Sequence, residues 1–173
     1  MKKFEKDIAV SDFIPKYVDV EKFLGFCKQC PFYAKSWSCQ PYDFDPMDVW
    51  HSYKTLKVIA CQFEPKPGMD KDACLKYLTE VKNDLLEYTY ALEKKYPGSR
   101  ALAAGVCQWC EPRTCARATG EPCRYPHLMR YSIESLGGDV VGVINELMGL
   151  QLKWTDDETP PEYFIMCGGL LMK

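Results

Sequence analysis

The pattern of hydrophobic and polar residues predicts a mixed α+β chain. Residues 55–63, Thr-Leu-Lys-Val-Ile-Ala-Cys-Gln-Phe, are rich in strand-forming residues and stop at Pro65-Lys66-Pro67-Gly68, which predicts a strand and a turn. Apolar residues then recur at alternating spacings of three and four from residue 74 to residue 92. This spacing predicts a long amphipathic helix that ends before Pro97-Gly98, with Lys82 among the charged residues of its solvent face.

The second half of the chain predicts further strands and one helix on the same sheet. Residues 101–106 are short, uncharged and bounded by glycine and cysteine, as in a buried central strand. Asp139 is expected to cap a helix over residues 140–148, which Gly149 would terminate. Residues 151–154 and 163–172 predict two strands that form a terminal hairpin.

Together these elements predict one α+β domain over residues 1–173. We expect a sandwich of a mixed or antiparallel sheet with two main helices, and a ferredoxin-like folding pattern is one option. The length of 173 residues is ordinary for one domain, and no internal repeat or Gly/Ser linker divides the chain.

Seven of the ten cysteines fall into two clusters, which predict two metal-binding loops at residues 27–41 and 105–126. The first cluster has the spacing Cys-x2-Cys-x8-Cys, and the second has Cys-x2-Cys-x4-Cys-x7-Cys. A Cys-x2-Cys turn lets two thiolates, the ligands that soft metals prefer, converge on one site. The predicted metal ligands are Cys27, Cys30, Cys39, Cys107, Cys110, Cys115 and Cys123.

The remaining composition favours metal ligation over disulfides. Residues 1–7 show no apolar secretory signal, and 47% hydrophobic residues can bury a core without disulfides, so we expect a reducing cytoplasm. The apolar stretch 136–150 contains Asp139, Asn145 and Glu146 and is shorter than the roughly 20 residues of a membrane span, so none is expected. A formal net charge of −2 argues against a generic nucleic-acid partner.

The cysteine spacing leaves the metal open between an iron–sulfur cluster and zinc. Several unevenly spaced cysteines in one loop are typical of a [4Fe–4S] site. Structural zinc more often takes two Cys-x2-Cys pairs or adds histidines, and this chain has only His51 and His127. The three cysteines of the first cluster are compatible with an open, catalytic iron position. They are also compatible with a fourth ligand from elsewhere, such as Cys61 or His51, or with one composite site, and these two interpretations together are favoured over the open position.

Cationic residues follow the second cluster. A cysteine-ligated site carries negative charge, which they would offset, or they would bind an anionic substrate or an acidic redox partner. An ordinary solvated loop is the competing interpretation. These residues are Arg113, Arg117, Arg124, Arg130 and His127.

The three remaining cysteines are predicted to serve the core. They lie in apolar stretches, where a free cysteine usually behaves as a small hydrophobic residue. We therefore expect burial rather than metal ligation for Cys61, Cys74 and Cys167.

The order of these motifs resembles the predicted metal-binding proteins called domain of unknown function 2284. The resemblance rests on segments 27–41, 105–115 and 120–140 and on Gly169-Leu170-Leu171, so it extends over nearly the whole chain. Gln40, Val106 and Tyr131 stand where the family often has proline, which changes loop stiffness and leaves the cysteines intact. The resemblance implies metal binding. Members of this family are frequent in anaerobic bacteria and archaea, which favours oxygen-sensitive iron–sulfur chemistry.

These observations predict a cytoplasmic metal-binding protein with one or two [4Fe–4S] clusters. Its predicted function is electron transfer to or from a redox protein partner. The alternative is a zinc-stabilised protein-interaction module without catalysis, in which the metal contributes folding free energy. A second alternative is an enzyme with an open iron site at the three-cysteine cluster.

Overall fold

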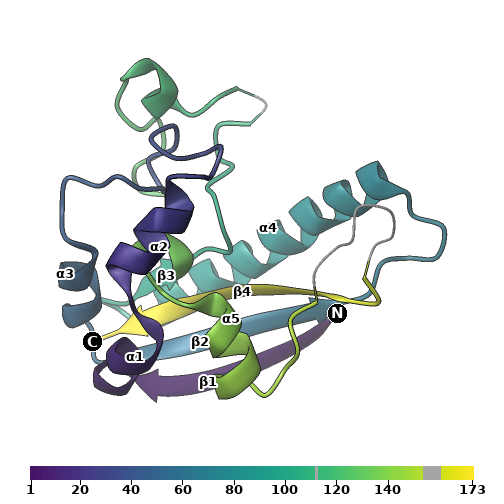
Figure 1. The fold of residues 1–173 in the computed structure, drawn as a ribbon, viewed down its shortest axis with the longest axis horizontal. Coiled ribbons are helices and arrows are strands. Elements are labelled where there is room, and N and C mark those ends of the chain that lie inside the picture. Colours follow the sequence, from purple (N-terminus) through teal and green to yellow (C-terminus); the bar gives the residue numbers. More distant parts are fainter. Residues whose placement is uncertain (112, 154–160) are drawn as a thin grey trace.

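A four-stranded antiparallel sheet forms the centre of the molecule (Figure 1). The computed structural model describes residues 1–111, 113–153 and 161–173. The strands are β1 (Lys2–Ala9), β2 (Thr55–Phe63), β3 (Arg100–Leu102) and β4 (Phe164–Met172), in the order β1-β2-β4-β3. Each neighbouring pair is antiparallel. This arrangement confirms the α+β class and the antiparallel sheet. It also confirms the two strands predicted at 55–63 and 163–172, although the second strand begins one residue later than predicted.

Helices lie on both faces of this sheet. On one face lies α4 (Lys71–Lys95), and on the other lie α1 (Val10–Tyr17), α3 (Pro46–His51) and α5 (Val140–Gly142), which continues as the π-helical turn η3 (Val143–Leu147). The remaining helical elements are α2 (Val20–Cys27) and the 3-10 turns η1 (Ala116–Thr119) and η2 (Glu134–Leu136). Five α-helices in the described ranges exceed the two main helices expected, and their order with the strands does not confirm a ferredoxin-like pattern.

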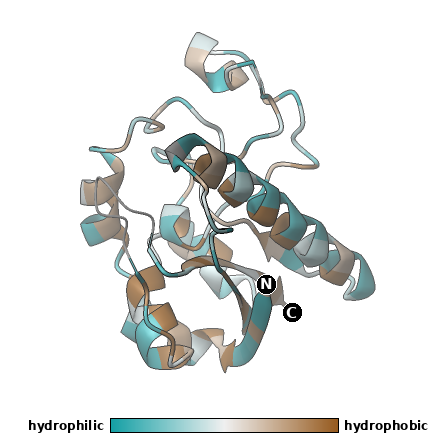
Figure 2. Cartoon of the chain, turned by 90° about the vertical axis from the view of Figure 1, so that its right-hand side faces the viewer, coloured by the Kyte–Doolittle hydropathy of each residue, from teal (hydrophilic) through white to brown (hydrophobic). Residues whose placement is uncertain are grey.

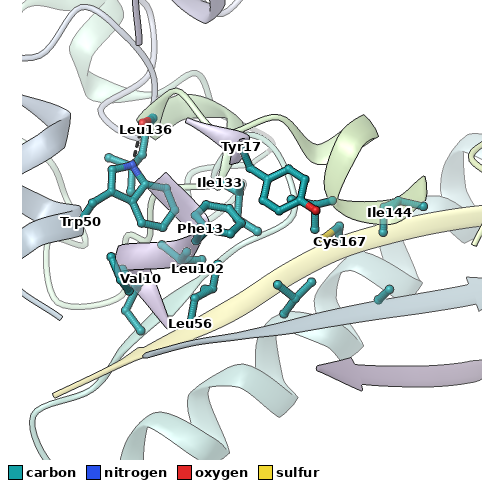
Figure 3. Packing of buried hydrophobic residues seen from close by; sticks show 14 residues of the cluster. Val10, Phe13, Tyr17, Trp50, Leu56, Leu102, Ile133, Leu136, Ile144 and Cys167 are labelled. Carbon is teal, nitrogen blue, oxygen red and sulfur yellow. Dashed lines mark hydrogen bonds between the residues drawn. The ribbon is translucent and has the colours of Figure 1, made fainter. Parts of the chain in front are cut away.

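The side chains of β2 alternate between two cores because successive strand residues point to opposite faces. Leu56 is fully buried against α1 and α3 (Figure 3), whereas Ile59 is fully buried against α4. In the first core, the indole Nε1 of Trp50 donates a hydrogen bond of 2.9 Å to the carbonyl of Leu136. This bond ties α3 to η2, the turn that supports the first cysteine loop.

The long helix α4 confirms the amphipathic segment, with one polar residue misplaced. Hydrophobic and hydrophilic residues alternate along it in Figure 2, and the Asp70 carboxylate accepts a hydrogen bond from the Ala73 N–H at its start. The helical pattern predicts Lys82 on the solvent face, but Lys82 is only 9% exposed and its Nζ donates to the carbonyl of Val106. The prediction for Lys82 is wrong because the chain after β3 passes over that side of α4.

No helix in the described ranges combines the length and the apolar character that crossing a membrane requires.

The region predicted as a central strand lies at the edge of the sheet. Residues 101–104 are buried as expected, but β3 ends at Leu102 and pairs only with β4. Beyond it, Ala103 forms a parallel bridge with Ser132. The prediction of a terminal hairpin is also wrong for the described part of the chain. Residues 151–153 form no strand, and residue 154 lies outside the described residues. The last strand, β4, pairs with β2 and β3 instead.

The second predicted helix is confirmed as α5 together with η3. The Asp139 side chain accepts a hydrogen bond of 2.9 Å from the Gly142 N–H, and Gly149 has a positive φ of 65° after the helix. Val143 and Ile144 are fully buried in the first core, which fastens this helix to the sheet.

Candidate metal centre

The two cysteine loops lie side by side beyond the end of α2 (Figure 1). We call residues 27–41 loop one and residues 105–126 loop two. The Cys107 N–H of loop two donates a hydrogen bond of 3.0 Å to Ser38 Oγ of loop one. In the opposite direction, Trp37 Nε1 donates to the carbonyl of Glu121 at 3.0 Å. Hydrogen bonds therefore join segments that are about 70 to 80 residues apart in the sequence.

Arg117 of loop two holds loop one through its guanidinium group. Its Nη1 donates to the carbonyls of Ser36 at 2.9 Å and Cys39 at 2.6 Å, and its Nη2 donates to the carbonyl of Pro41. The guanidinium carbon also lies 5.0 Å from the ring centroid of Trp37. Because a planar guanidinium presents five donors in a fixed fork, one side chain can hold several carbonyls of a turn at once.

All four cysteines of loop two line one cavity of about 320 Å³. Residues 31–32 and 35–38 of loop one form part of its wall. Burial raises the pKa of the Cys107 thiol; the Trp109 N–H lowers it in part, and the neighbouring thiols of Cys123, Cys110 and Cys115 raise it further. The structure thus brings the four thiols of the second cluster to a single cavity.

The three cysteines of loop one are also neighbours. Cys27 is the last residue of α2, and its carbonyl accepts a hydrogen bond of 3.0 Å from the Cys30 N–H. Burial raises the pKa of the Cys27 thiol, and the thiols of Cys39 and Cys30 raise it further. Burial likewise raises the pKa of Cys39, while the Ser38 hydroxyl, 3.8 Å from Cys39 Sγ, and the Ser36 hydroxyl oppose the rise.

The chemistry of this donor set fits a thiophilic metal. Each loop gathers thiols, and four thiols around one cavity are the ligands that zinc and iron–sulfur clusters both accept. Within residues 1–111, 113–153 and 161–173, no three Cys, His, Asp or Glu side chains are close enough together to hold a single ion. Within the described ranges, the four thiols of loop two therefore share a cavity and the three thiols of loop one are neighbours, without forming a one-ion coordination sphere.

The predicted cationic residues divide into two groups. Arg130 is 7% exposed, and its guanidinium makes a bidentate ion pair with Glu93, with distances of 2.7 and 2.9 Å. Arg124 donates to the carbonyl of Thr114 at 2.8 Å, within loop two. Arg113 and His127 are exposed. Arg117, Arg124 and Arg130 thus donate to protein groups, and the anion-binding role of the five residues stays a prediction.

The three core cysteines are confirmed as buried. Cys61, Cys74 and Cys167 all lie in the interior, and Cys61 packs in the core between the sheet and α4. His51, the other residue considered as a fourth ligand for loop one, is exposed at the end of α3.

Two polar residues near the loops were not expected from the sequence. Oε2 of Glu134 is buried and has no hydrogen-bond partner in the described part of the chain. Burial raises the pKa of Glu134, and its charge in turn helps to raise the pKa of Cys27. Burial lowers the pKa of Lys82, whereas the thiol of Cys107 raises it. Glu134 lies in a segment that carries the family resemblance, but Lys82 follows the ordinary pattern of an amphipathic helix.

A comparison with protein families finds a match that covers residues 14–172 and is described as predicted metal-binding protein, DUF2284. The chain belongs to the DUF2284 family. The resemblance carried by the cysteine motifs is thereby confirmed, and both loops of this DUF2284 protein lie inside the matched region. No curated protein and no solved structure matches the chain. The family description supports metal binding in general and names no particular metal.

Proposed function

We propose that this DUF2284 protein holds a [4Fe–4S] cluster on loop two and transfers electrons. The ligands would be Cys107, Cys110, Cys115 and Cys123, and the supporting observation is the cavity of about 320 Å³ that all four line. A zinc ion lies about 2.3 Å from each of its sulfur ligands and leaves no cavity between them. A cubane cluster needs room for four irons and four sulfides among its ligands. The shared cavity and the uneven spacing of the four cysteines within one loop support the cluster.

The walls of the cavity suit such a cluster. A thiolate-ligated cluster carries net negative charge, and Arg113 and Arg117 of the surrounding loop would offset it. Phe32, Trp109 and Met129 line the same cavity and would limit the access of water, which tunes the reduction potential. Because such clusters are sensitive to oxygen, the proposal includes a reducing cytoplasm as the working compartment.

Exposed aromatic side chains near the cavity support a protein partner. Phe32 is 47% and Trp109 is 39% exposed, although both line the cavity, and Phe26 at the end of α2 is 58% exposed. Aromatic side chains are enriched at protein interfaces. We propose that a redox protein binds over these residues. The same surface would serve the alternative function, a zinc-stabilised interaction module, so this observation favours a partner without deciding the metal.

Loop one is the place where the protein would differ from a simple electron carrier. If Cys27, Cys30 and Cys39 held a second cluster, one iron would lack a cysteine ligand. In the described residues the buried Oε2 of Glu134 has no hydrogen-bond partner, and the charge of Glu134 adds to the burial that raises the pKa of Cys27, so Glu134 belongs to the surroundings of this site. An iron position without a thiolate would be open to a substrate, which is the second alternative, an enzyme.

Alanine variants test the assignment of ligands. The protein is isolated without oxygen, reduced with dithionite and examined by electron paramagnetic resonance, together with iron and sulfide analysis. Cys115→Ala should lose the signal and the iron of the loop-two cluster, whereas Cys27→Ala should keep that signal. Cys74→Ala is the matched control, because Cys74 is a buried cysteine of α4, and it should retain both. Stoichiometric zinc without sulfide in the wild type and in Cys74→Ala, with zinc lost in Cys115→Ala, would replace the proposal by the zinc alternative.

A further inference from the structure

A second cavity, of about 400 Å³, adjoins the cysteine cavity. One wall comes from the side of α4 between residues 79 and 90, and the facing wall comes from residues 106–109 of the chain after β3. Cys107, Gln108 and Trp109 line both cavities. The volume lies within the range of about 300 to 1,000 Å³ that is usual for small-molecule sites. A molecule bound here would therefore lie beside a proposed cluster ligand.

The cavity contains a buried cation. Lys82 lines it and is only 9% exposed. Its ammonium group has three donors, and the hydrogen bond to the carbonyl of Val106 uses one of them. Lys82 takes part in none of the ion pairs within the described ranges. Since buried charges are normally paired, this ammonium is suited to an anionic group of a ligand.

The cavity also offers an acceptor. Gln108 lines it, and the Oε1 of its side chain is buried without a hydrogen-bond partner in the part of the chain that the structure describes. Buried polar atoms are nearly always hydrogen-bonded, so an exception requires an explanation such as a missing ligand or water. An N–H or O–H group of the bound molecule would satisfy Gln108 Oε1.

The aromatic side of the cavity is held in place by protein contacts. The rings of Tyr90 and Trp109 are stacked with centroids 6.3 Å apart, and Trp109 Nε1 donates to the Tyr90 hydroxyl at 3.2 Å. The Arg130 guanidinium lies 4.8 Å from the Tyr90 ring centroid while its donors bind Glu93. A preformed aromatic wall of this kind favours a ligand with a flat apolar body.

The remaining charges restrict the ligand further. Glu87 and Glu111 also line the cavity, and both are exposed. Two carboxylates at exposed positions would repel a polyanion such as a nucleoside triphosphate. Of the two buried cations that line the cavity, Arg130 is paired with Glu93, so Lys82 is the one that can pair with a negative charge of the ligand. The charges therefore favour a monoanion.

We propose that this cavity binds a small organic carboxylate with one negative charge and a hydrogen-bond donor. The carboxylate would accept from Lys82 Nζ, the donor would bind Gln108 Oε1, and the apolar body would contact Trp109. Binding as such does not require a metal. Cys107 lines both cavities, so the bound molecule would lie beside a cluster ligand, a placement that rests on the proposed function.

Titration calorimetry with two matched probes tests the proposal. The full chain, isolated without oxygen, is titrated with 4-hydroxybenzoate and with the neutral 4-hydroxybenzamide. Because a hydrogen bond to a charged group is stronger than a neutral one, the wild type should bind the carboxylate at least about tenfold more tightly than the amide. Lys82→Met keeps a long side chain without charge and should abolish this preference. Lys76→Met, at an exposed position of the same helix, should leave it unchanged.

A second variant keeps the test decisive if Lys82→Met fails to fold. Gln108→Glu has nearly the same shape and places a negative charge beside the ligand, so carboxylate binding should weaken by about tenfold or more. Equal affinity for both probes, unchanged binding in both variants, or no binding up to about 10 mM would overturn the proposal. A zinc-containing protein that still binds the carboxylate would reject the cluster and keep this site. A cluster-containing protein that fails to bind would reject only this site.

Discussion

Arg117→Ala should separate loop one from loop two while the sheet stays folded. The guanidinium of Arg117 donates to three carbonyls of loop one and stacks on Trp37. None of these partners belongs to the sheet or to the cores on its two faces. The expected result is therefore a local opening of the cysteine loops rather than global unfolding.

The size of the effect follows from the hydrogen bonds. The bond to Pro41 lies at an exposed position, where water replaces it, so we count only those to the carbonyls of Ser36 and Cys39. A hydrogen bond from a charged donor contributes about 1.5 kcal/mol or more, and the two together contribute about 3 kcal/mol. This free energy corresponds to a change of about 150-fold in the opening equilibrium of the loops.

Hydrogen exchange of the Cys107 amide measures this opening. That N–H donates to Ser38 Oγ across the two loops but makes no contact with Arg117 itself, so it reports on loop separation. Its protection should fall about 100-fold in Arg117→Ala, while the amides of β2 keep their protection. Arg117→Lys should recover only part of the loss, because an ammonium group cannot reproduce the planar fork.

Arg113→Ala serves as the control, since Arg113 is an exposed arginine of the same loop. It should leave the protection of the Cys107 amide unchanged. If protection in Arg117→Ala stayed within about threefold of the wild type, the two loops would be held by something other than the Arg117 contacts, and the reasoning would be refuted.

Three further predictions concern stability, each measured by urea unfolding. Gly138→Ala should destabilise the protein by about 2 kcal/mol or more, because a Cβ there would lie 2.4 Å from Ile133 Cγ2. The control is Gly25→Ala in α2, where a Cβ would meet no atom within 4 Å, and it should stabilise the protein by about 0.5 to 1 kcal/mol. Equal effects of the two substitutions would refute the packing around Gly138. Trp50→Phe should cost about 2 to 3 kcal/mol, since it leaves the buried Leu136 carbonyl without its donor; a loss below about 0.5 kcal/mol would contradict this role. For Glu93, burial raises the pKa, but the bonds from Arg130 and the Ala101 N–H outweigh it and hold the pKa below its ordinary value of 4.5. The stabilisation by the Glu93 carboxylate is therefore present above about pH 4.5 and is lost as the pH falls through the lower folded-state pKa. Glu93→Gln should consequently lose less stability in acid than the wild type. Parallel pH profiles of the two proteins would contradict this role of Glu93.

The central elements were predictable because each carries a complete periodic pattern. β2 alternates between two buried faces, and α4 shows apolar residues at helical spacing over 25 residues. β1 lacks such a pattern: it is an edge strand with charged residues on both faces, and its position depends on pairing with β2 from Lys2 opposite Gln62 to Ala9 opposite Thr55. Such a strand is defined by its partner rather than by its own hydrophobicity.

The short helices before β2 show a different reason for failure. α3 has a readable start, since Asp45 caps it and Pro46 stands at its first position. The preceding helix α2 has no fully buried residue, so its hydrophobic pattern carries little information. α1 contains Pro15, a residue that usually argues against a helix interior, yet its buried face includes the fully buried Phe13.

In the candidate site, contacts between residues that are near in the sequence were predictable, whereas contacts between residues that are far apart in the sequence were not. The cysteine spacing predicts which thiols are neighbours within each loop, because these cysteines are close in the sequence. The contacts between the loops, such as Cys107 with Ser38, join residues that are 69 positions apart. The burial of Lys82 likewise results from a segment that follows it by 24 residues. These contacts depend on the complete fold, so the second cavity had no signal in the sequence.

The metal and sulfide content of the wild-type protein tests the central claim most directly. The protein is purified under strict exclusion of oxygen, and iron, sulfide and zinc are measured per chain together with the visible spectrum before and after dithionite. A loop-two cluster predicts four irons with matching sulfide, or eight if loop one also holds a cluster, and a visible band that dithionite bleaches. One or two zinc ions per chain in a colourless protein that stays folded in air would contradict the electron-transfer proposal.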